Sequence, residues 1–190
     1  MIEHKGHGGF ILGDTAMEEY EPWLRPSSAR YIESVLPKGA FVFEWGMGAS
    51  TVWMAKLGCH VISLELDHDW FLAIEEILEK EKLDASIYCF GMSNDYDKYA
   101  DYILKYDDNL FDLVLIDGRN RCRCLANARS KVKVGGMLCL DNSEREEYQK
   151  AVALLDTWNG YTWGDFGWET TVWTRPDGTI KPVTFESEDA

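Results

Sequence analysis

Apolar residues gather in five short runs over the first three-quarters of the chain. The runs cover residues 40–45, 59–65, 85–90, 111–117 and 134–142. Runs of this length, bounded by glycine or polar residues, are typical of strands that are buried on both faces of a parallel sheet. We therefore predict five parallel strands, of which the run at 111–117 has the clearest pattern.

Between these runs, apolar residues recur three or four positions apart, which predicts helices. The predicted apolar helix faces include Ile32, Ile74, Tyr99, Leu125 and Val152. Strands that alternate with helices in this way form an α/β, doubly wound sheet with right-handed crossovers.

The C-terminal part of the chain follows a different pattern. Residues 161–173 are rich in aromatic side chains, and the Arg-Pro-Asp-Gly sequence at 175–178 is a strong turn signal between two extended runs. We predict a terminal antiparallel strand pair at this position. Together with the five parallel strands, the pair gives a mostly parallel seven-stranded sheet.

A chain of 190 residues is large enough for one domain with a substantial core. We predict a single domain over residues 1–190. Its core covers residues 25–175, preceded by a tail or lid at 1–24 and followed by a C-terminal strand and acidic tail at 176–190.

A glycine-rich loop joins the first strand to the next helix within residues 40–51. Gly46 and Gly48 allow a sharp turn and a close approach of the backbone to a ligand, because neither carries a Cβ atom. Ser50 or Thr51 can cap the following helix, whose free N–H groups then face the same ligand. The dinucleotide fingerprint G-x-G-x-x-G is incomplete, because its third glycine position holds Thr51. The loop predicts a nucleotide site and leaves its ligand open.

Polar residues follow the predicted strands. Glu44 lies just before the first glycine, where a carboxylate repels a pyrophosphate but suits a cationic amino group. Glu65 follows Gly46 by nineteen residues, about the separation at which an acid reaches ribose hydroxyls in such folds. Ligands of doubly wound sheets lie beyond the carboxyl ends of the strands. The polar residues predicted there are Glu44, Glu65, Ser93, Asp117 and Asp141.

The net charge of −14 argues against polyanions as partners, because phosphate backbones and anionic membranes require clustered cations. No apolar stretch is long enough to span a membrane, and the N-terminal residues lack the apolar region of a signal peptide. The five cysteines are an odd number and fit a reducing compartment. We therefore expect a cytoplasmic protein that binds neither nucleic acid nor membranes.

This arrangement resembles the class I S-adenosylmethionine-dependent methyltransferases over roughly residues 25–175. The segment Glu44-x-Gly46-x-Gly48 is similar to their first motif, and Glu65 to their ribose-binding acid. Within that class, the chain looks closest to the catechol-type, metal-dependent small-molecule O-methyltransferases. The resemblance implies a Rossmann-like methyltransferase fold, S-adenosylmethionine as cofactor, and methyl transfer to an oxygen of a small-molecule acceptor.

The resemblance also implies roles for single residues. Glu65 would bind the ribose hydroxyls, and Glu44 the α-amino group, directly or through water. Leu66 would pack against the purine, while Ser93 and Asn94 would bind the adenine edge. The implied cofactor-binding set is Glu44, Gly46, Gly48, Ser50, Glu65, Leu66, Ser93, Asn94 and Asp117.

In the catechol-type enzymes a divalent ion is held by an Asp after the fourth strand and an Asp-Asn pair after the fifth. Asp117, Asp141 and Asn142 stand in those positions. By this resemblance they would bind Mg²⁺, which lowers the pKa of an acceptor hydroxyl and orients it, and Asp117 would be the catalytic residue. The same side chains can also serve as polar ligands to the methionine part of the cofactor.

The chain departs from the catechol-type pattern at Asn120, where those enzymes place a lysine general base. Arg119, Arg121 and Arg123 surround this position in a chain of net charge −14. Cations are disfavoured at a helix N-terminus, so the cluster requires another reason. Our hypothesis is that Arg119 or Arg121 binds an anionic group of the acceptor or pairs with acids nearby.

Two other functions fit the same loop. One is a nicotinamide-dependent oxidoreductase, against which Thr51 and Glu44 both count. The other is a non-catalytic cofactor-binding module, which would need neither metal ligands nor an arginine cluster. The methyl acceptor and the oligomeric state stay open.

Overall fold

The computed structural model describes residues 20–91, 95–165, 167–178 and 180. In chain order its elements are α1 (Pro26–Val35), β1 (Phe41–Trp45), α2 (Ala49–Lys56), β2 (His60–Glu65), α3 (His68–Glu81), β3 (Ala85–Cys89), α4 (Tyr96–Asp101), η1 (Tyr102–Lys105), β4 (Phe111–Ile116), α5 (Arg121–Ala128), β5 (Val132–Asp141), η2 (Glu146–Tyr148), α6 (Gln149–Val152), η3 (Ala153–Leu155), β6 (Asn159–Asp165) and β7 (Trp168–Thr174).

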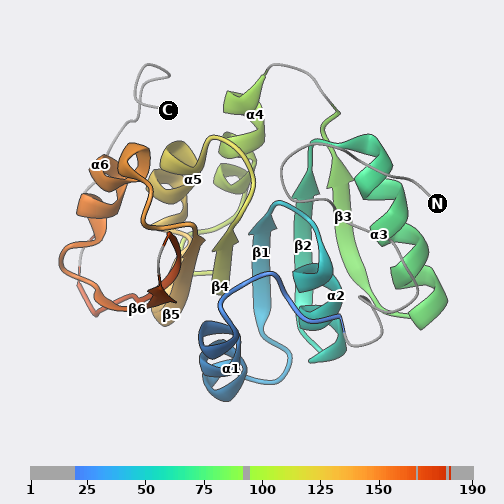
Figure 1. The fold of residues 1–190 in the computed structure, drawn as a ribbon, viewed down its shortest axis with the longest axis horizontal. Helices are drawn as coiled ribbons and strands as arrows, with labels where there is room; N and C mark the ends of the chain where they lie inside the picture. Colours follow the sequence, from blue (N-terminus) through green and yellow to red (C-terminus); the bar gives the residue numbers. More distant parts are fainter. Residues whose placement is uncertain (1–19, 92–94, 166, 179, 181–190) are drawn as a thin grey trace.

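The described strands form one seven-stranded sheet in the order β3-β2-β1-β4-β5-β7-β6 (Figure 1). Strands β1 to β5 pair in parallel, β7 pairs antiparallel with β5, and β6 pairs antiparallel with β7. The predicted doubly wound, mostly parallel sheet with an antiparallel C-terminal pair is confirmed. The strand order changes direction between β1 and β4, so a ligand crevice is expected beyond their carboxyl ends.

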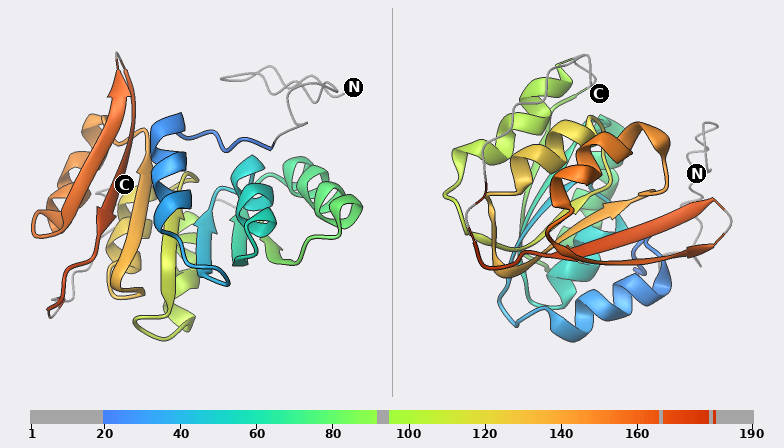
Figure 2. Two further views of the ribbon diagram at one scale, coloured as in Figure 1. Left: turned by 90° about the horizontal axis from the view of Figure 1, so that it is seen from below. Right: turned by 90° about the vertical axis from the view of Figure 1, so that its left-hand side faces the viewer.

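Successive side chains of the central strands supply two separate cores. Phe43 and Trp45 of β1 pack on one face of the sheet against apolar residues of α4, α5 and α6. Val42 packs on the other face against apolar residues of α1, α2 and α3. Figure 2 shows α4, α5 and α6 on one side of the sheet and α1 on the other. Because both faces are covered, the strands read as continuous apolar runs in the sequence.

Strand β5 begins earlier than predicted. Val132 already pairs with Phe111 of β4, so Gly135 and Gly136 lie inside the strand. The pairing register shifts between Phe111 and Leu113, and Gly135 has a φ of +78°. The two glycines therefore form an irregularity within β5.

The C-terminal hairpin turns at a different position from the predicted one. Asp165 of β6 pairs with Trp168 of β7, and Gly167 between them has a φ of +98°, which favours glycine. The turn at 175–178 follows β7 instead of joining the two strands of the pair. The prediction of this turn as the hairpin connection was wrong, because the glycine that closes the hairpin, Gly167, lies eleven residues before Gly178.

The side chain of Arg175, just after β7, holds the end of this strand in place. It is buried and donates hydrogen bonds to Asn109 Oδ1 at 2.8 Å and to the backbone oxygen of Val132. These bonds fix the end of β7 against the starts of β4 and β5.

Of the predicted tail or lid at 1–24, the structure describes residues 20–24. Tyr20 and Leu24 are buried, and the Tyr20 hydroxyl donates to Glu81 of α3 at 3.2 Å. The rest of that segment lies outside the described residues, as do residues 179 and 181–190 of the predicted C-terminal strand and acidic tail. In the described part of the chain, no helix is both long and apolar enough to cross a membrane.

Candidate functional site

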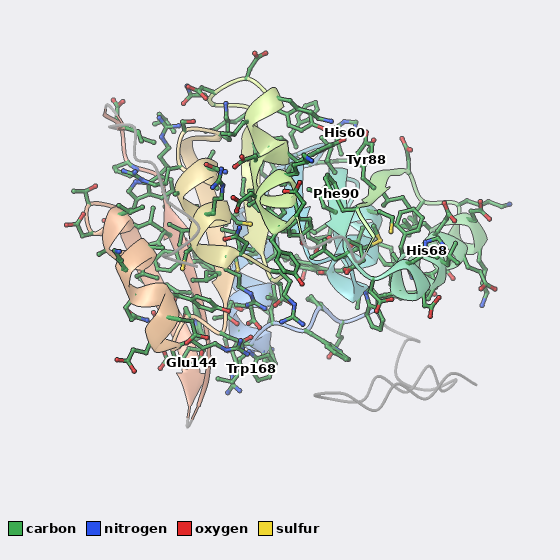
Figure 3. The ribbon with its side chains drawn as sticks, turned by 90° about the horizontal axis from the view of Figure 1, so that it is seen from above. His60, His68, Tyr88, Phe90, Glu144 and Trp168 are labelled. Atoms are coloured by element: carbon green, nitrogen blue, oxygen red, sulfur yellow. The ribbon has the colours of Figure 1, made fainter. Side chains whose placement is uncertain are left out.

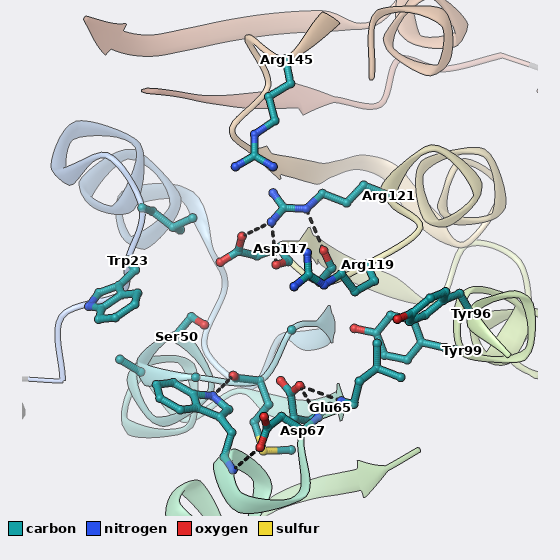
Figure 4. Close-up of a pocket in the computed structure, with 18 residues that line it drawn as sticks. Trp23, Ser50, Glu65, Asp67, Tyr96, Tyr99, Asp117, Arg119, Arg121 and Arg145 are labelled. Carbon is teal, nitrogen blue, oxygen red and sulfur yellow. Dashed lines mark hydrogen bonds and ion pairs between the residues drawn. The ribbon is translucent and has the colours of Figure 1, made fainter. Parts of the chain in front are cut away.

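A cavity of about 520 Å³ opens beyond the carboxyl ends of β1, β2 and β4, where doubly wound sheets bind ligands (Figure 4). Its walls come from the glycine loop, the ends of β2 and β4, the starts of α3, α4 and α5, and the segment before α1. The predicted site residues that line it are Gly46, Gly48, Ser50, Glu65, Leu66, Asp117, Arg119 and Arg121.

Gly46 is required for the meeting of two strand ends. Its φ is +93°, and a Cβ atom at this position would lie 2.7 Å from the backbone carbon of Asp117 and 2.7 Å from the backbone nitrogen of Gly118. Gly48, the next glycine of the loop, is the N-cap of α2, and its N–H donates to Thr51 Oγ1 at 3.1 Å. The loop therefore passes tightly against the end of β4.

Glu44 does not line the cavity, although its predicted role was to bind the cofactor amino group. Its carboxylate is fully buried and accepts hydrogen bonds from the hydroxyls of Ser50, Thr51 and Ser63. Burial raises the pKa of Glu44 to about 7, against the lowering effect of the three hydroxyls. Glu44 thus connects β1 to the start of α2 and to β2, and supports the glycine loop from behind.

Glu65 lies at the end of β2 and faces the cavity. Its Oε1 accepts hydrogen bonds from the backbone N–H groups of Leu66 at 2.7 Å and Asp67 at 2.9 Å, which fix the carboxylate. Burial raises the pKa of Glu65, while those backbone donors lower it. Asp67 also caps α3, since its Oδ1 accepts from the Trp70 N–H at 3.0 Å.

Four aromatic residues that no sequence motif indicated also line the cavity, and one of them, Trp23, comes from the segment before α1. Trp70 donates a hydrogen bond from Nε1 to the backbone oxygen of Met47, which ties α3 to the glycine loop. Tyr96 and Tyr99 come from α4. Ser93 and Asn94, predicted to bind adenine, lie outside the described residues, and their role stays a prediction.

Asp117 follows β4, and Arg121 of α5 lies against it. Nη2 of Arg121 is 2.8 Å from both the backbone oxygen and Oδ1 of Asp117, and Nε is 2.9 Å from the oxygen of Gly118. Nη1 reaches the backbone oxygen of Asp141 at 2.6 Å and Asn142 Oδ1 at 3.5 Å. All three N–H-bearing nitrogens of this guanidinium are therefore directed at oxygen atoms of the β4 and β5 ends.

The Asp141 carboxylate is held by β7. Trp168 Nε1 donates to its two oxygens at 3.0 and 3.1 Å, and Thr170 Oγ1 donates to Oδ1 at 2.6 Å. Figure 3 shows Trp168 near Glu144, which accepts a hydrogen bond from the backbone of the neighbouring Glu169. The Asp141 carboxylate is thus satisfied by two side chains of β7.

The predicted metal set does not fit a divalent ion. Mg²⁺ requires oxygen ligands arranged around it at about 2.1 Å, whereas Asp117 and Asn142 already accept hydrogen bonds from the positively charged Arg121. Asp141 is occupied by two donors from β7. Among the described residues, no group of three or more His, Cys, Asp or Glu side chains could hold a metal ion. The guanidinium of Arg121 lies among the residues that the resemblance predicted as Mg²⁺ ligands.

Asn120 and Arg123 contact α4, whereas Arg119 lies at the cavity. Asn120 donates from Nδ2 to the backbone oxygen of Tyr96 at 3.3 Å and to Asp97 Oδ1 at 3.1 Å, so it contacts α4. Arg123 pairs with Asp101 at 2.7 Å and is also directed at α4. Arg119 is exposed and lines the cavity, together with Arg145, which no sequence motif indicated.

No protein-family model matches the chain, and no curated protein matches it by sequence. Solved structures do match its fold. A methyltransferase-like protein from Silicibacter pomeroyi DSS-3 has 20% sequence identity and a TM-score of 0.64, over 86% of this chain and 91% of that chain. An S-adenosylmethionine-dependent O-methyltransferase from Thermotoga maritima has 13% identity and a TM-score of 0.63, over 85% of this chain and 69% of that chain.

A third match is the 16S rRNA N2 G1207 methyltransferase from T. thermophilus, solved in complex with AdoMet and guanosine. It has 17% identity and a TM-score of 0.59, over 80% of this chain and 43% of that chain. The similarity to the O-methyltransferase is no greater than that to the methyltransferase-like protein, so the comparisons single out no catechol-type relative. This chain has the Rossmann-like fold of S-adenosylmethionine-dependent methyltransferases.

Proposed function

We propose that the protein is an S-adenosylmethionine-dependent methyltransferase that acts on a small-molecule acceptor, at oxygen. The observation that supports this most strongly is that the Gly46 loop, Glu65 and Asp117 meet in one cavity at the switch between β1 and β4. A carboxylate fixed by two backbone N–H groups is pre-organised to accept hydrogen bonds from ribose hydroxyls. Leu66 beside it offers an apolar contact for the purine.

Methyl transfer from a sulfonium is an in-line displacement. The acceptor oxygen forms a bond to the methyl carbon, the carbon–sulfur bond breaks, and its electron pair returns to sulfur as a thioether. The task of the protein is to hold the oxygen in line with the methyl group and to receive the hydroxyl proton.

We assign Asp117 as the residue that receives the hydroxyl proton of the acceptor. Its Oδ1 is bonded to Arg121, whereas its Oδ2 accepts no hydrogen bond from the described residues. Burial raises the pKa of Asp117 to about 7, against the lowering effect of Arg121. A carboxylate that titrates near neutral pH is suited to receive a proton from an acceptor. Metal assistance is not part of the proposed function, because Arg121 hydrogen-bonds to Asp117 Oδ1 and Asn142 Oδ1 and places a positive charge among the predicted ligands.

The choice of a small acceptor over RNA rests on charge. The comparisons include rRNA methyltransferases, so the fold accommodates both kinds of acceptor. A chain of net charge −14 repels a phosphate backbone, and this cost grows with the length of the RNA.

Calorimetric titration with S-adenosylhomocysteine tests the cofactor assignment. We expect micromolar binding to the wild-type protein and a loss of at least about tenfold in Glu65→Ala, since the variant lacks the ribose partner. Glu76→Ala, an exposed change on α3, is the matched control and should bind like the wild type. Tighter binding of NADH than of S-adenosylhomocysteine would instead favour the oxidoreductase, and failure of both to bind would refute the proposed function.

A transfer assay with methyl-labelled S-adenosylmethionine tests the acceptor. Label should enter a fraction of small molecules and leave total RNA unlabelled. Transfer into RNA would show that the small-molecule assignment is wrong while leaving the methyltransferase assignment intact.

A further inference from the structure

Charge is divided between two sides of the cavity. On one side, Glu65 ends β2 and Asp67 lies in the loop after it. On the opposite side lie three arginines, Arg119, Arg121 and Arg145 (Figure 4). The acidic side is the one that the proposed function assigns to the cofactor ribose. The basic side is left for the acceptor.

The three arginines are not equivalent. Arg121 directs its guanidinium at oxygens of Asp117, Gly118 and Asp141, and its side chain is only 9% exposed. Its hydrogen-bonding capacity is used within the protein, and its charge is balanced by Asp117. Arg121 therefore positions the β4 and β5 ends, which fits the alternative in our hypothesis that an arginine of this cluster pairs with acids nearby.

Arg119 and Arg145 keep their charge available. Within the described part of the chain, the Arg119 side chain forms no ion pair or hydrogen bond. Arg145 contacts two neutral groups, Asn142 Oδ1 at 3.1 Å and the Tyr148 hydroxyl at 3.4 Å. Among the described residues, neither arginine has a carboxylate partner, although the chain has 33 acidic and 19 basic residues.

We propose that the acceptor carries an oxyanion, a carboxylate or a phosphate monoester, which Arg119 and Arg145 bind. Guanidinium groups match such oxyanions with paired N–H donors. This inference rests on the proposed function, because it takes the other side of the cavity to hold the cofactor. Trp23 and Tyr96, which are 54% and 44% exposed, line the same cavity and offer ring faces to the rest of the acceptor.

The cofactor also has a carboxylate, so the test must separate it from the acceptor. Binding of benzoate, phenyl phosphate and the uncharged benzyl alcohol is measured by calorimetry, with and without S-adenosylhomocysteine. The proteins are the wild type, the double variant Arg119→Ala/Arg145→Ala, its lysine counterpart, and Arg30→Ala. Arg30 is an exposed arginine of α1 that does not line the cavity and serves as the matched control.

We expect at least one of the two anions to bind the wild type and Arg30→Ala at least about tenfold more tightly than benzyl alcohol. The double alanine variant should lose this preference, the lysine variant should keep part of it, and the affinity for S-adenosylhomocysteine should stay the same in all four proteins. An unchanged preference in the double alanine variant, or no preference in the wild type, would overturn the inference.

A loss of S-adenosylhomocysteine affinity in the double alanine variant would also overturn it, because the arginines would then serve the cofactor carboxylate. Failure of the proposed function looks different. The wild type would then not bind S-adenosylhomocysteine, whereas the preference for anions could still be measured in the protein without cofactor.

Discussion

Arg121 and Asp117 contact each other twice, through hydrogen bonds of 2.8 Å from Nη2 to the backbone oxygen and to Oδ1 of Asp117. The two residues stand four positions apart, at the end of β4 and the start of α5. The other terminal nitrogen of the same guanidinium reaches Asp141 at the end of β5 at 2.6 Å. One side chain thus ties two neighbouring strand ends at the edge where the cavity opens.

Arg121→Ala should therefore destabilise the fold. The change removes a mostly buried cation and leaves the Asp117 carboxylate without its partner. Because Asp117 is still 30% exposed, we expect a loss of about 2 kcal/mol in the free energy of unfolding, below the range for fully buried pairs. Urea denaturation measures this, with Arg30→Ala as the control. Equal stability of Arg121→Ala and wild type would show that the contacts of Arg121 contribute nothing to the free energy of unfolding.

Gly46→Ala should abolish cofactor binding and lower stability by about 2 kcal/mol or more, because its Cβ would overlap the backbone of residues 117–118 at a φ of +93°. Gly58→Ala separates the effect of steric overlap from that of the positive φ. Gly58 also has a positive φ, of +79°, but no atom lies within 4 Å of its added Cβ. We expect Gly58→Ala to cost about 1 kcal/mol and to leave S-adenosylhomocysteine affinity unchanged. Similar losses in both variants would contradict the overlap.

The buried carboxylate of Glu44 should make stability depend on pH. Its pKa is raised from 4.5 to about 7 in the folded protein, so the folded state binds the proton more tightly than the unfolded state. The resulting stabilisation is complete below about pH 4.5 and is lost as the pH rises through about 7. Glu44→Gln should flatten this fall, measured as the free energy of unfolding between these pH values.

Asp117 titrates in the same range, so Glu44→Gln should reduce the pH slope without removing it. Asp117→Asn provides the matching comparison. If the slope of Glu44→Gln equals that of the wild type, Glu44 has an ordinary pKa in the folded protein.

Mg²⁺ should have no effect on this protein. Since Arg121 places its charge beside Asp117 Oδ1 and Asn142 Oδ1, metal-stripped protein should show the same unfolding temperature and the same S-adenosylhomocysteine affinity with and without Mg²⁺. Direct calorimetric titration with MgCl₂ provides the decisive reading. Saturable binding that Asp141→Asn removes would restore the metal site that the resemblance implied.

The sequence was sufficient for the succession of five parallel strands along the chain and for the placement of Gly46, Glu65 and Asp117 around one cavity, whereas the order of the strands in the sheet comes from the structure. These features depend on local apolar runs and on the rule that parallel strands present their carboxyl ends at one edge. The pairing of Arg121 with Asp117 fits the part of our hypothesis in which an arginine of this cluster pairs with a nearby acid.

The remaining features depend on contacts between distant segments, which no local pattern encodes. Glu44 is satisfied by Ser63 from the neighbouring strand, Asp141 by Trp168 and Thr170 from β7. Arg145 reaches the cavity from the loop after β5, without a motif of its own. The roles of Glu44 and of the metal set could therefore not be settled from residue types alone.

The position of Trp23 gives the cavity a built-in optical reporter. Its ring lies 6.4 Å from that of Trp70 on α3, and it is 54% exposed on the segment just before α1. A ligand that covers this indole replaces water around it, which shifts its fluorescence to shorter wavelength. Comparison of wild type with Trp23→Phe isolates this signal from the other tryptophans, so occupancy of the site can be followed in solution before the acceptor is identified.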